Sequence, residues 1–179
     1  MGIETGSRNL REIFNRREFS NERILKVIQS INKYKRRIIP PHYDFILDSP
    51  YETTQDKIES LKLISKIPRP FRLQTFSMVL YPGTKLYQMA KKDGLIKDEK
   101  KEIYDRSYVT RKNRGYLNLL FSLARGGRLP SGLLRLLISQ PIVSILAGRI
   151  LNPFFQYFNS ILIVFYHSVI WFFRLGKKK

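Results

Sequence analysis

Two short apolar segments, 43–47 and 71–79, each lie between amphipathic segments, and this alternation constrains the fold of the 179-residue chain more than any other feature. The first segment is rich in aromatic and branched side chains, and the second alternates apolar and polar residues; both patterns are typical of β-strands. With residues 2–4 as the end of a first strand, each of three strands is followed by a helix. This order predicts a parallel α/β sheet.

Capping residues mark the predicted helices of this part. Ser20 precedes an apolar stripe whose members recur at steps of three and four residues, as on one face of a helix. Thr53, with Asp56 three residues later, predicts a capping box at the start of a second helix. A third, short helix is expected over residues 85–93, with Gly94 as its C-terminal cap.

The charge is unevenly distributed along the chain. The formal net charge is +19, and the last 74 residues carry +12 of it because no carboxylate follows Asp105. Such a surplus favours contact with polyanions, which include nucleic acid, anionic lipid and phosphorylated ligands. No motif of a DNA or RNA reader is present, so we expect no nucleic-acid partner.

A basic, mostly helical tail follows the α/β part. We divide the chain into the α/β part (1–97), a basic helical extension (98–140) and an apolar tail (141–179). The uncharged stretch 154–173 is long enough to cross a hydrocarbon core of ~30 Å, but nine of its twenty residues are aromatic, a bias more usual at the headgroup level. Three alternatives stay open for this stretch: it spans a membrane, it lies on an anionic membrane surface with Lys177–Lys179 as an anchor, or it is buried in a larger protein.

The N-terminal residues indicate a cellular location, and the cysteine count limits the kinds of site that the chain can form. The first residues lack both a basic and an apolar leader region, so we expect a cytoplasmic protein, which the apolar tail could hold at the inner face of the membrane. The chain has no cysteine, which excludes disulfides, thiolate zinc sites and any iron–sulfur cluster held by its own thiolates.

The candidate binding residues lie in the loops that follow the predicted strands. In parallel α/β folds, ligands bind outside the carboxyl ends of the strands. The loops at that position are 4–7, 48–52 and 81–84, and the first two carry carboxylates or hydroxyls that can bind a sugar or an amine. Strand-to-helix turns also require Gly, Pro, Ser and Thr, so spacing alone favours a purely structural role.

These loops resemble three blocks in the C-terminal half of radical S-adenosylmethionine (SAM) enzymes, in particular the subgroup with a cobalamin-binding domain. Residues 2–7 are similar to the Gly-hydrophobic-Glu-Ser/Thr-Gly-Ser block of that family, residues 43–53 to its strand-plus-Pro-x-Glu-Thr block, and residues 81–87 to its Pro-Gly-Thr block. The blocks occur in order over about residues 1–97. The resemblance implies a partial TIM-type barrel of about three strand-helix units, since a complete barrel takes ~250 residues.

The resemblance also implies which residues contact SAM. The first block would lie near the ribose and the amino acid part, the middle block would support the adenine side, and the third block would pass its backbone close to the adenine. The implied SAM-binding residues are Glu4, Thr5, Ser7, Ile46, Asp48, Pro50, Glu52, Pro82 and Gly83. Asp48 stands where many members of that family have Gly. Whether the backbone at this residue approaches SAM closely therefore stays an open question.

The family's Cys-x-x-x-Cys-x-x-Cys loop has no counterpart in this sequence. We therefore expect this chain alone neither to hold a [4Fe-4S] cluster nor to cleave SAM. The cluster and cobalamin would belong to a missing N-terminal half or parent protein, which is the expected partner. Whether the chain takes part in an enzyme stays open. The alternative is a non-catalytic basic protein attached to anionic membrane through its C-terminal aromatic segment.

Overall fold

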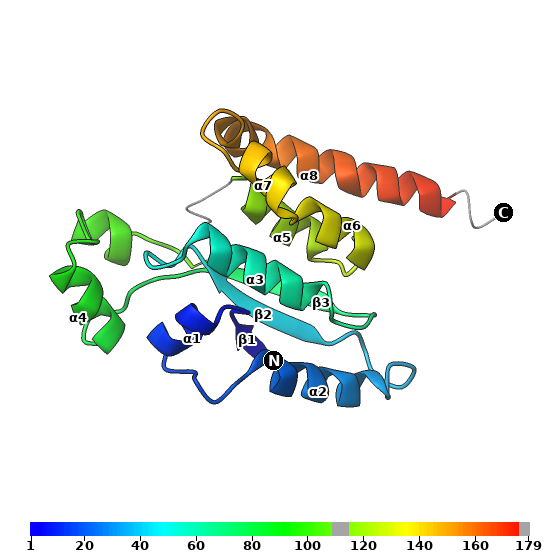
Figure 1. The fold of residues 1–179 in the computed structure, drawn as a ribbon, viewed down its shortest axis with the longest axis horizontal. Helices are drawn as coiled ribbons and strands as arrows, with labels where there is room; N and C mark the ends of the chain where they lie inside the picture. The colour runs from blue at the N-terminus through cyan, green and yellow to red at the C-terminus, as the bar shows by residue number, and fades with distance from the viewer. Residues whose placement is uncertain (109–114, 176–179) are drawn as a thin grey trace.

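A three-stranded parallel sheet lies at the centre of the computed structural model, which describes residues 1–108 and 115–175 (Figure 1). The strands are β1 (Gly2–Glu4), β2 (His42–Leu47) and β3 (Arg72–Ser77), in the order β1-β2-β3. β2 and β3 pair in regular register over their whole lengths, whereas the register of β1 against β2 shifts by one residue between Gly2 and Glu4. The predicted parallel α/β sheet is confirmed.

Helices connect the strands and continue after the last one. β1 is joined to β2 through α1 (Arg8–Ile13) and α2 (Asn21–Asn32), and β2 to β3 through α3 (Thr54–Ile64). β3 is followed by α4 (Lys85–Lys92) and a short π-helix, η1 (Lys100–Tyr104). The second part of the chain contains α5 (Tyr116–Ala124), α6 (Ser131–Leu137), α7 (Gln140–Leu146) and α8 (Asn152–Leu175).

The predicted caps lie at the ends of the helices. The Ser20 hydroxyl accepts a hydrogen bond from the Arg23 N–H at the start of α2. Thr53 and Asp56 form a reciprocal capping box at the start of α3. Gly94 follows α4 with a φ of +66°, the left-handed conformation of a helix-ending glycine. The helices α1 and η1 are not among the predicted ones.

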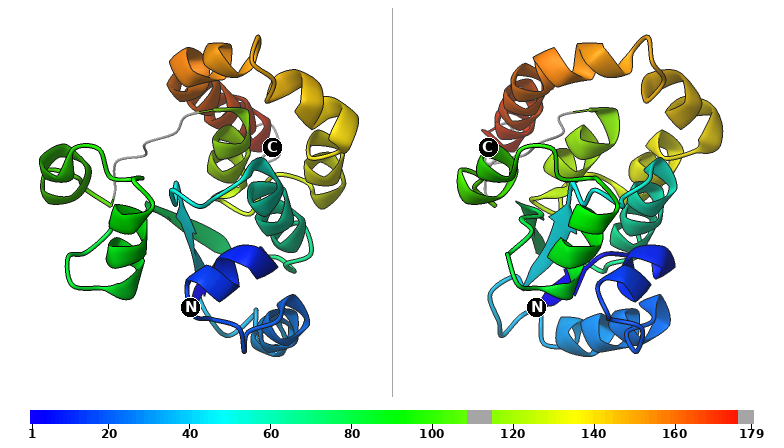
Figure 2. Two further views of the ribbon diagram at one scale, coloured as in Figure 1. Left: turned by 60° about the vertical axis from the view of Figure 1, so that its left-hand side comes forward. Right: turned by 90° about the vertical axis from the view of Figure 1, so that its left-hand side faces the viewer.

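Helices cover one face of the sheet, as Figure 2 shows for α2, α3 and α5. Alternate side chains of β2 point into this layer, and Tyr43, Phe45 and Leu47 are almost fully buried. Phe121 of α5 packs on Phe45, with ring centroids 6.2 Å apart. The helical extension therefore shares its main core with the α/β part, because the core includes residues of α5, α6 and α7 beside those of the sheet.

A second, smaller core lies at the carboxyl end of the sheet. It consists of Met78, Leu80, Tyr87, Ala90 and Ile103, which come from the segment just after β3, from α4 and from η1. Ile46, whose side chain lies on the opposite face of β2 from Phe45, packs against this cluster. The segment of α4 and η1 therefore partly covers the face of the sheet that the larger helical layer leaves free.

α8 packs on α5 by one side only. The N–H of Tyr116 donates to Asn152 Oδ1 at 3.0 Å, and the rings of Tyr116 and Phe155 are 5.0 Å apart. The opposite side of α8 exposes Phe154, Tyr157, Phe158, Ile161, Val164 and Phe165. Within the described ranges no helix is both long and apolar enough to cross a membrane. Lys177–Lys179 lie outside the described residues.

Candidate functional site

The three predicted loops follow the carboxyl ends of three neighbouring parallel strands. Each loop contains a residue with left-handed backbone: Glu4 has a φ of +69°, Asp48 of +61° and Gly83 of +86°. Residues with side chains rarely adopt this conformation, so it marks a tight turn that the surrounding structure holds in place. Gly adopts it most readily. Asp48 therefore makes a turn that a Gly at this position would favour.

The first loop is held against α3. Thr5 Oγ1 lies 3.2 Å from Ser60 Oγ, and the N–H of Gly6 donates to the same oxygen at 2.8 Å. Ser7 donates from its hydroxyl to Asp56 Oδ1 at 2.5 Å and also caps α1. Burial by itself would raise the pKa of Asp56, but hydrogen bonds, first of all the one from Ser7, hold it below its usual value. The side chains of Thr5 and Ser7 are thus engaged inside the chain.

The middle loop is tied to neighbouring elements by the carboxylate of Asp48. Its Oδ1 accepts a hydrogen bond from Asn118 Nδ2 of α5 at 3.0 Å, and its Oδ2 accepts one from the Ser77 hydroxyl of β3 at 2.9 Å. The N–H of Asp48 donates to Glu52 Oε2 at 2.8 Å, which closes the loop on itself. Asp48 therefore joins the loop to both the sheet and the helical extension.

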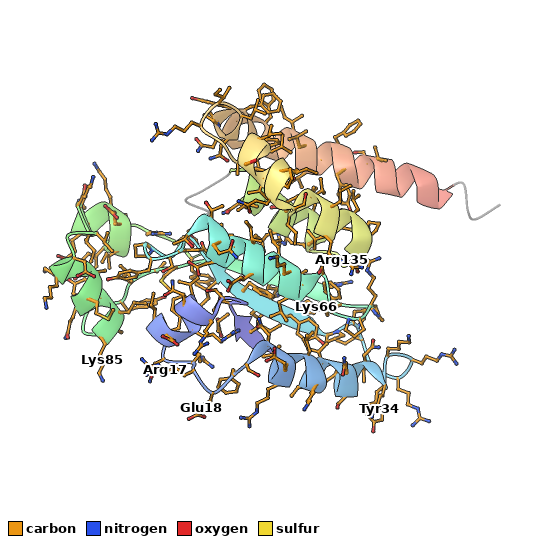
Figure 3. All side chains as sticks on the ribbon, in the orientation of Figure 1. Arg17, Glu18, Tyr34, Lys66, Lys85 and Arg135 are labelled. Carbon is orange, nitrogen blue, oxygen red and sulfur yellow. The ribbon has the colours of Figure 1, made fainter. Side chains whose placement is uncertain are left out.

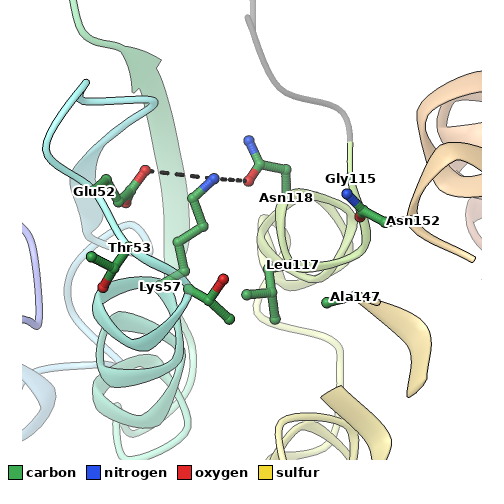
Figure 4. A pocket seen from close by; sticks show the side chains of 9 residues that line it. Glu52, Thr53, Lys57, Gly115, Leu117, Asn118, Ala147 and Asn152 are labelled. Carbon is green, nitrogen blue, oxygen red and sulfur yellow. Dashed lines mark hydrogen bonds and ion pairs between the residues drawn. The ribbon is translucent and has the colours of Figure 1, made fainter. Parts of the chain in front are cut away.

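Lys57 of α3 brings the positive charge into this network. Its Nζ lies 3.6 Å from Glu52 Oε2 and donates to Asn118 Oδ1 at 2.7 Å (Figure 4). The same Nζ lies 3.9 Å from Asp48 Oδ1. The Lys57 side chain is 9% exposed, and both carboxylates are 1% exposed. Burial raises the pKa of Glu52 to about 7, although Lys57 opposes the rise. Glu52 is therefore poised to gain or lose a proton near neutral pH.

A cavity of about 130 Å³ borders this network, between the middle loop, α3, α5 and the start of α8 (Figure 4). Pockets that enclose ligands of nucleoside size or larger usually have volumes of about 300–1,000 Å³. The cavity beside Glu52 and Lys57 is smaller, so it suits water molecules or a small ion and does not fit SAM.

The other predicted site residues lie in different surroundings. Ile46 is covered by the second core. Glu4 is half-buried, and its Oε1 lies 3.8 Å from the guanidinium of Arg16; burial raises the pKa of Glu4, and Arg16 opposes the rise. The exposed residues of the predicted set are Pro50, Pro82 and Gly83. The structure therefore gathers Asp48 and Glu52 in one network and leaves Glu4 and the third loop outside it.

The sequence analysis missed the partners of the Asp48 carboxylate. Lys57 stands three and four residues before Ser60 and Leu61, a spacing that places it on the buried side of α3. Asn118 is a single amide in an apolar helical run. A charged or amide side chain in such a position usually has a buried partner, which is the signal that could have revealed the network. Arg106, which donates to the Ser77 hydroxyl at 2.7 Å, had no such signal.

The residues of this chain do not fit an iron–sulfur cluster, because none of the 179 is a cysteine. In ranges 1–108 and 115–175, no three His, Asp or Glu side chains gather in a way that could hold a metal ion. No protein-family model matches the chain, and no curated protein matches it in sequence.

Proposed function

We propose that residues 1–97 form one side of a SAM site in a parallel β/α barrel of the radical SAM type, in the subgroup with a cobalamin-binding domain. The observation that supports this most is that the three resembling blocks follow three adjacent parallel strands, and each block turns on a residue of left-handed backbone. The helices on one face of the sheet agree with the outer layer of such a barrel. The [4Fe-4S] cluster and cobalamin would come from the rest of the parent protein.

Seven of the nine predicted site residues divide into two groups by their contacts. Glu4 and the exposed backbone at Pro82 and Gly83 would contact SAM, since they reach solvent at the carboxyl end of the sheet. Thr5, Ser7, Asp48 and Glu52 would hold the loops, because their side chains bond within the chain. The chemistry that SAM supplies in this family needs the cluster, so this chain by itself would bind SAM without cleaving it.

A titration of the ¹⁵N-labelled full chain with SAM, followed by NMR, tests this proposal. We expect the amide signals of residues 4–6 and 83–84 to shift in fast exchange, because these backbone groups lie at the carboxyl ends of the strands. Glu4→Gln should weaken the binding about tenfold, the effect of losing one polar contact of ordinary strength. Glu12→Gln is the matched control, because Glu12 is a partly exposed glutamate on α1 that pairs with Arg8.

Equal affinity of the two variants would contradict the assigned role of Glu4. Shifts confined to the cavity beside Lys57, or no shifts at all at high SAM concentration, would contradict the site itself.

Attachment to a membrane surface through α8 is a second candidate function. It is favoured by the exposed apolar side of this helix, where Tyr157 is 83% and Phe165 67% exposed to solvent. The exposed residues recur at steps of three and four, so they form one continuous stripe. An apolar stripe rich in aromatic residues is typical of helices that lie in the headgroup region.

Replacing two members of the stripe, Ile161→Gln with Phe165→Gln, should weaken partitioning into neutral phosphatidylcholine vesicles about 100-fold, because each apolar side chain is transferred out of water. Vesicle flotation of the full chain measures this. The control replaces two exposed apolar residues elsewhere, Val27→Gln with Met89→Gln, and should change partitioning less than threefold. Equal losses in both double variants would exclude a special role of α8.

A further inference from the structure

A strongly basic surface lies at the opposite end of the sheet from the candidate site. Three segments form it: 33–41 and 65–72, which lead into β2 and β3, and 125–139, which follows α5. Together they contain ten Lys or Arg residues and no Asp or Glu, and all ten cationic residues are exposed. They are Lys33, Lys35, Arg36, Arg37, Lys66, Arg69, Arg72, Arg125, Arg128 and Arg135. We call this region the amino-end basic surface.

The three segments are joined by hydrogen bonds. The Arg72 N–H donates to Pro41 O at 2.9 Å, and the Leu73 N–H of β3 donates to Arg125 O at 2.8 Å. The Arg69 guanidinium donates to Leu129 O. In Figure 3, Tyr34, Lys66 and Arg135 lie toward the same end of the molecule, away from Lys85 of α4. The ten cationic residues thus belong to one end of the fold.

The cations of this surface are not paired with carboxylates, although Lys66 is close enough to Glu22 of α2 to act on its charge. None of the ten forms an ion pair with Asp or Glu in the part of the chain that the structure describes. The buried carboxylates Asp48, Glu52 and Asp56 all lie at the carboxyl end of the sheet. The three amino-end segments carry a formal charge of +10, whereas segment 81–106 at the carboxyl end has seven Lys or Arg against five Asp or Glu. The amino end therefore attracts anions more strongly.

Exposed apolar side chains stand among these cations. Ile39 is 84% exposed, and Ile38 beside it is 42% exposed. The others are Tyr34, Leu133 and Leu136. Aliphatic side chains next to Lys and Arg suit a phospholipid surface, where the cations contact headgroups and the apolar groups enter the acyl boundary. A nucleic acid would instead be met by cations with stacking aromatic side chains, and Tyr34 is the single aromatic residue exposed within these three segments.

The turn after α2 shapes part of this surface into a hollow. The N–H of Tyr34 donates to Ile31 O and the N–H of Arg37 donates to Tyr34 O, so the chain curls back on itself. Lys33, Lys35, Arg36 and Arg37, with Tyr34, line a hollow of about 550 Å³. The hollow is of the size of ordinary ligand pockets and can admit a phospholipid headgroup.

We propose that the amino-end basic surface docks on an anionic phospholipid bilayer, with the headgroups at the Lys33–Arg37 turn and with Ile38 and Ile39 inserted between lipids. The proposal does not depend on SAM binding, since the SAM loops lie at the other end of the strands. It also differs from attachment through α8, in which the exposed apolar side of that helix, and not the turn after α2, contacts the bilayer.

Flotation of the full chain with vesicles of phosphatidylcholine and phosphatidylserine tests the proposal. A triple variant, Lys35→Gln with Arg36→Gln and Arg37→Gln, should lose about 100-fold in partitioning, because each basic residue near an anionic surface contributes several-fold. The matched control, Lys85→Gln with Lys92→Gln and Lys97→Gln, removes the same charge from exposed positions at the carboxyl end and should lose less than fivefold. For pure phosphatidylcholine vesicles, the two triple variants should not differ.

A second variant separates lipid from nucleic acid. Ile38→Ser with Ile39→Ser should lose about tenfold in partitioning to the anionic vesicles and should leave the binding of an RNA oligonucleotide unchanged. Equal losses in the two triple variants would reduce the effect to net charge and overturn the proposal. The proposal would also be overturned if the triple variant of Lys35, Arg36 and Arg37 bound the anionic vesicles as well as the parent chain does. The same holds if this variant lost binding to the RNA oligonucleotide and kept its binding to the vesicles.

Discussion

Replacing Lys57 by methionine is expected to lower the free energy of unfolding by about 3–5 kcal/mol, the usual loss when one member of a buried ion pair is removed. The substitution keeps an unbranched side chain of similar length but removes the cation that faces Asp48 and Glu52, whose side chains are 1% exposed. It also leaves Asn118 Oδ1 without the hydrogen bond from Nζ. Urea denaturation followed by circular dichroism measures the change.

The control for this prediction is Lys62→Met on the same helix. Lys62 is exposed, so its loss should change the free energy of unfolding by less than about 0.5 kcal/mol. A similar small change for Lys57→Met would mean that the ammonium group contributes little to the network, and would contradict the prediction.

The pH dependence of stability gives an independent view of the same pair. Burial raises the pKa of Glu52 to about 7 in the folded chain, from an ordinary value of 4.5. The folded state therefore binds more protons than the unfolded state between these values, and stability falls as the pH rises from 4.5 to 7, by about 3 kcal/mol in total. Glu52→Gln should remove this slope. In the Lys57→Met variant the fall of stability with pH should continue above pH 7, because the variant lacks the cation that opposes the rise of the Glu52 pKa.

The sequence predicted the α/β part better than the helices that follow it. Caps such as Ser20 and Thr53 act locally, and the strand patterns of 43–47 and 71–79 reflect burial on one or two faces, so both are visible without the fold. α1 was missed because its six residues are too short to show a period, and Leu10 is its only fully buried apolar side chain. The separation of α8 into a packed and an exposed side depends on where α5 lies, which no local pattern gives.

The site was predicted as a set of loops, and the loops follow neighbouring strands. The sequence could not predict which side chains in these loops form hydrogen bonds within the chain and which reach solvent. Ser7 has a hydroxyl suited to a ligand, but Asp56 and the start of α1 take it, and both contacts depend on how α3 packs on the first loop. The partners of Asp48 come from Ser77 and Asn118, which are 29 and 70 residues away in the chain. Contacts over such separations follow from the fold.

A substitution of Gly6 can distinguish two roles of the first loop, which are packing on α3 and contact with a ligand. A Cβ atom at this position would lie 2.6 Å from the Cα of Ser60 and 2.8 Å from the carbonyl oxygen of Glu59, which are backbone atoms of α3 and cannot rotate away. Gly6→Ala should therefore push the loop off the helix, weaken the hydrogen bond from the Gly6 N–H to Ser60, and lower the free energy of unfolding by about 2–3 kcal/mol.

Gly132→Ala is the matched control, because a Cβ atom there meets nothing within 4 Å and the residue lies in α6. It should raise the free energy of unfolding by about 0.5–1 kcal/mol, the difference between Ala and Gly in a helix. If Gly6 served only the approach of a ligand, Gly6→Ala would leave urea denaturation unchanged and would alter only the NMR titration with SAM. A loss of stability without ligand would instead show that this glycine is needed for the packing of the first loop on α3. Any contact of Thr5 or Ser7 with SAM would then depend on where this packing places the loop.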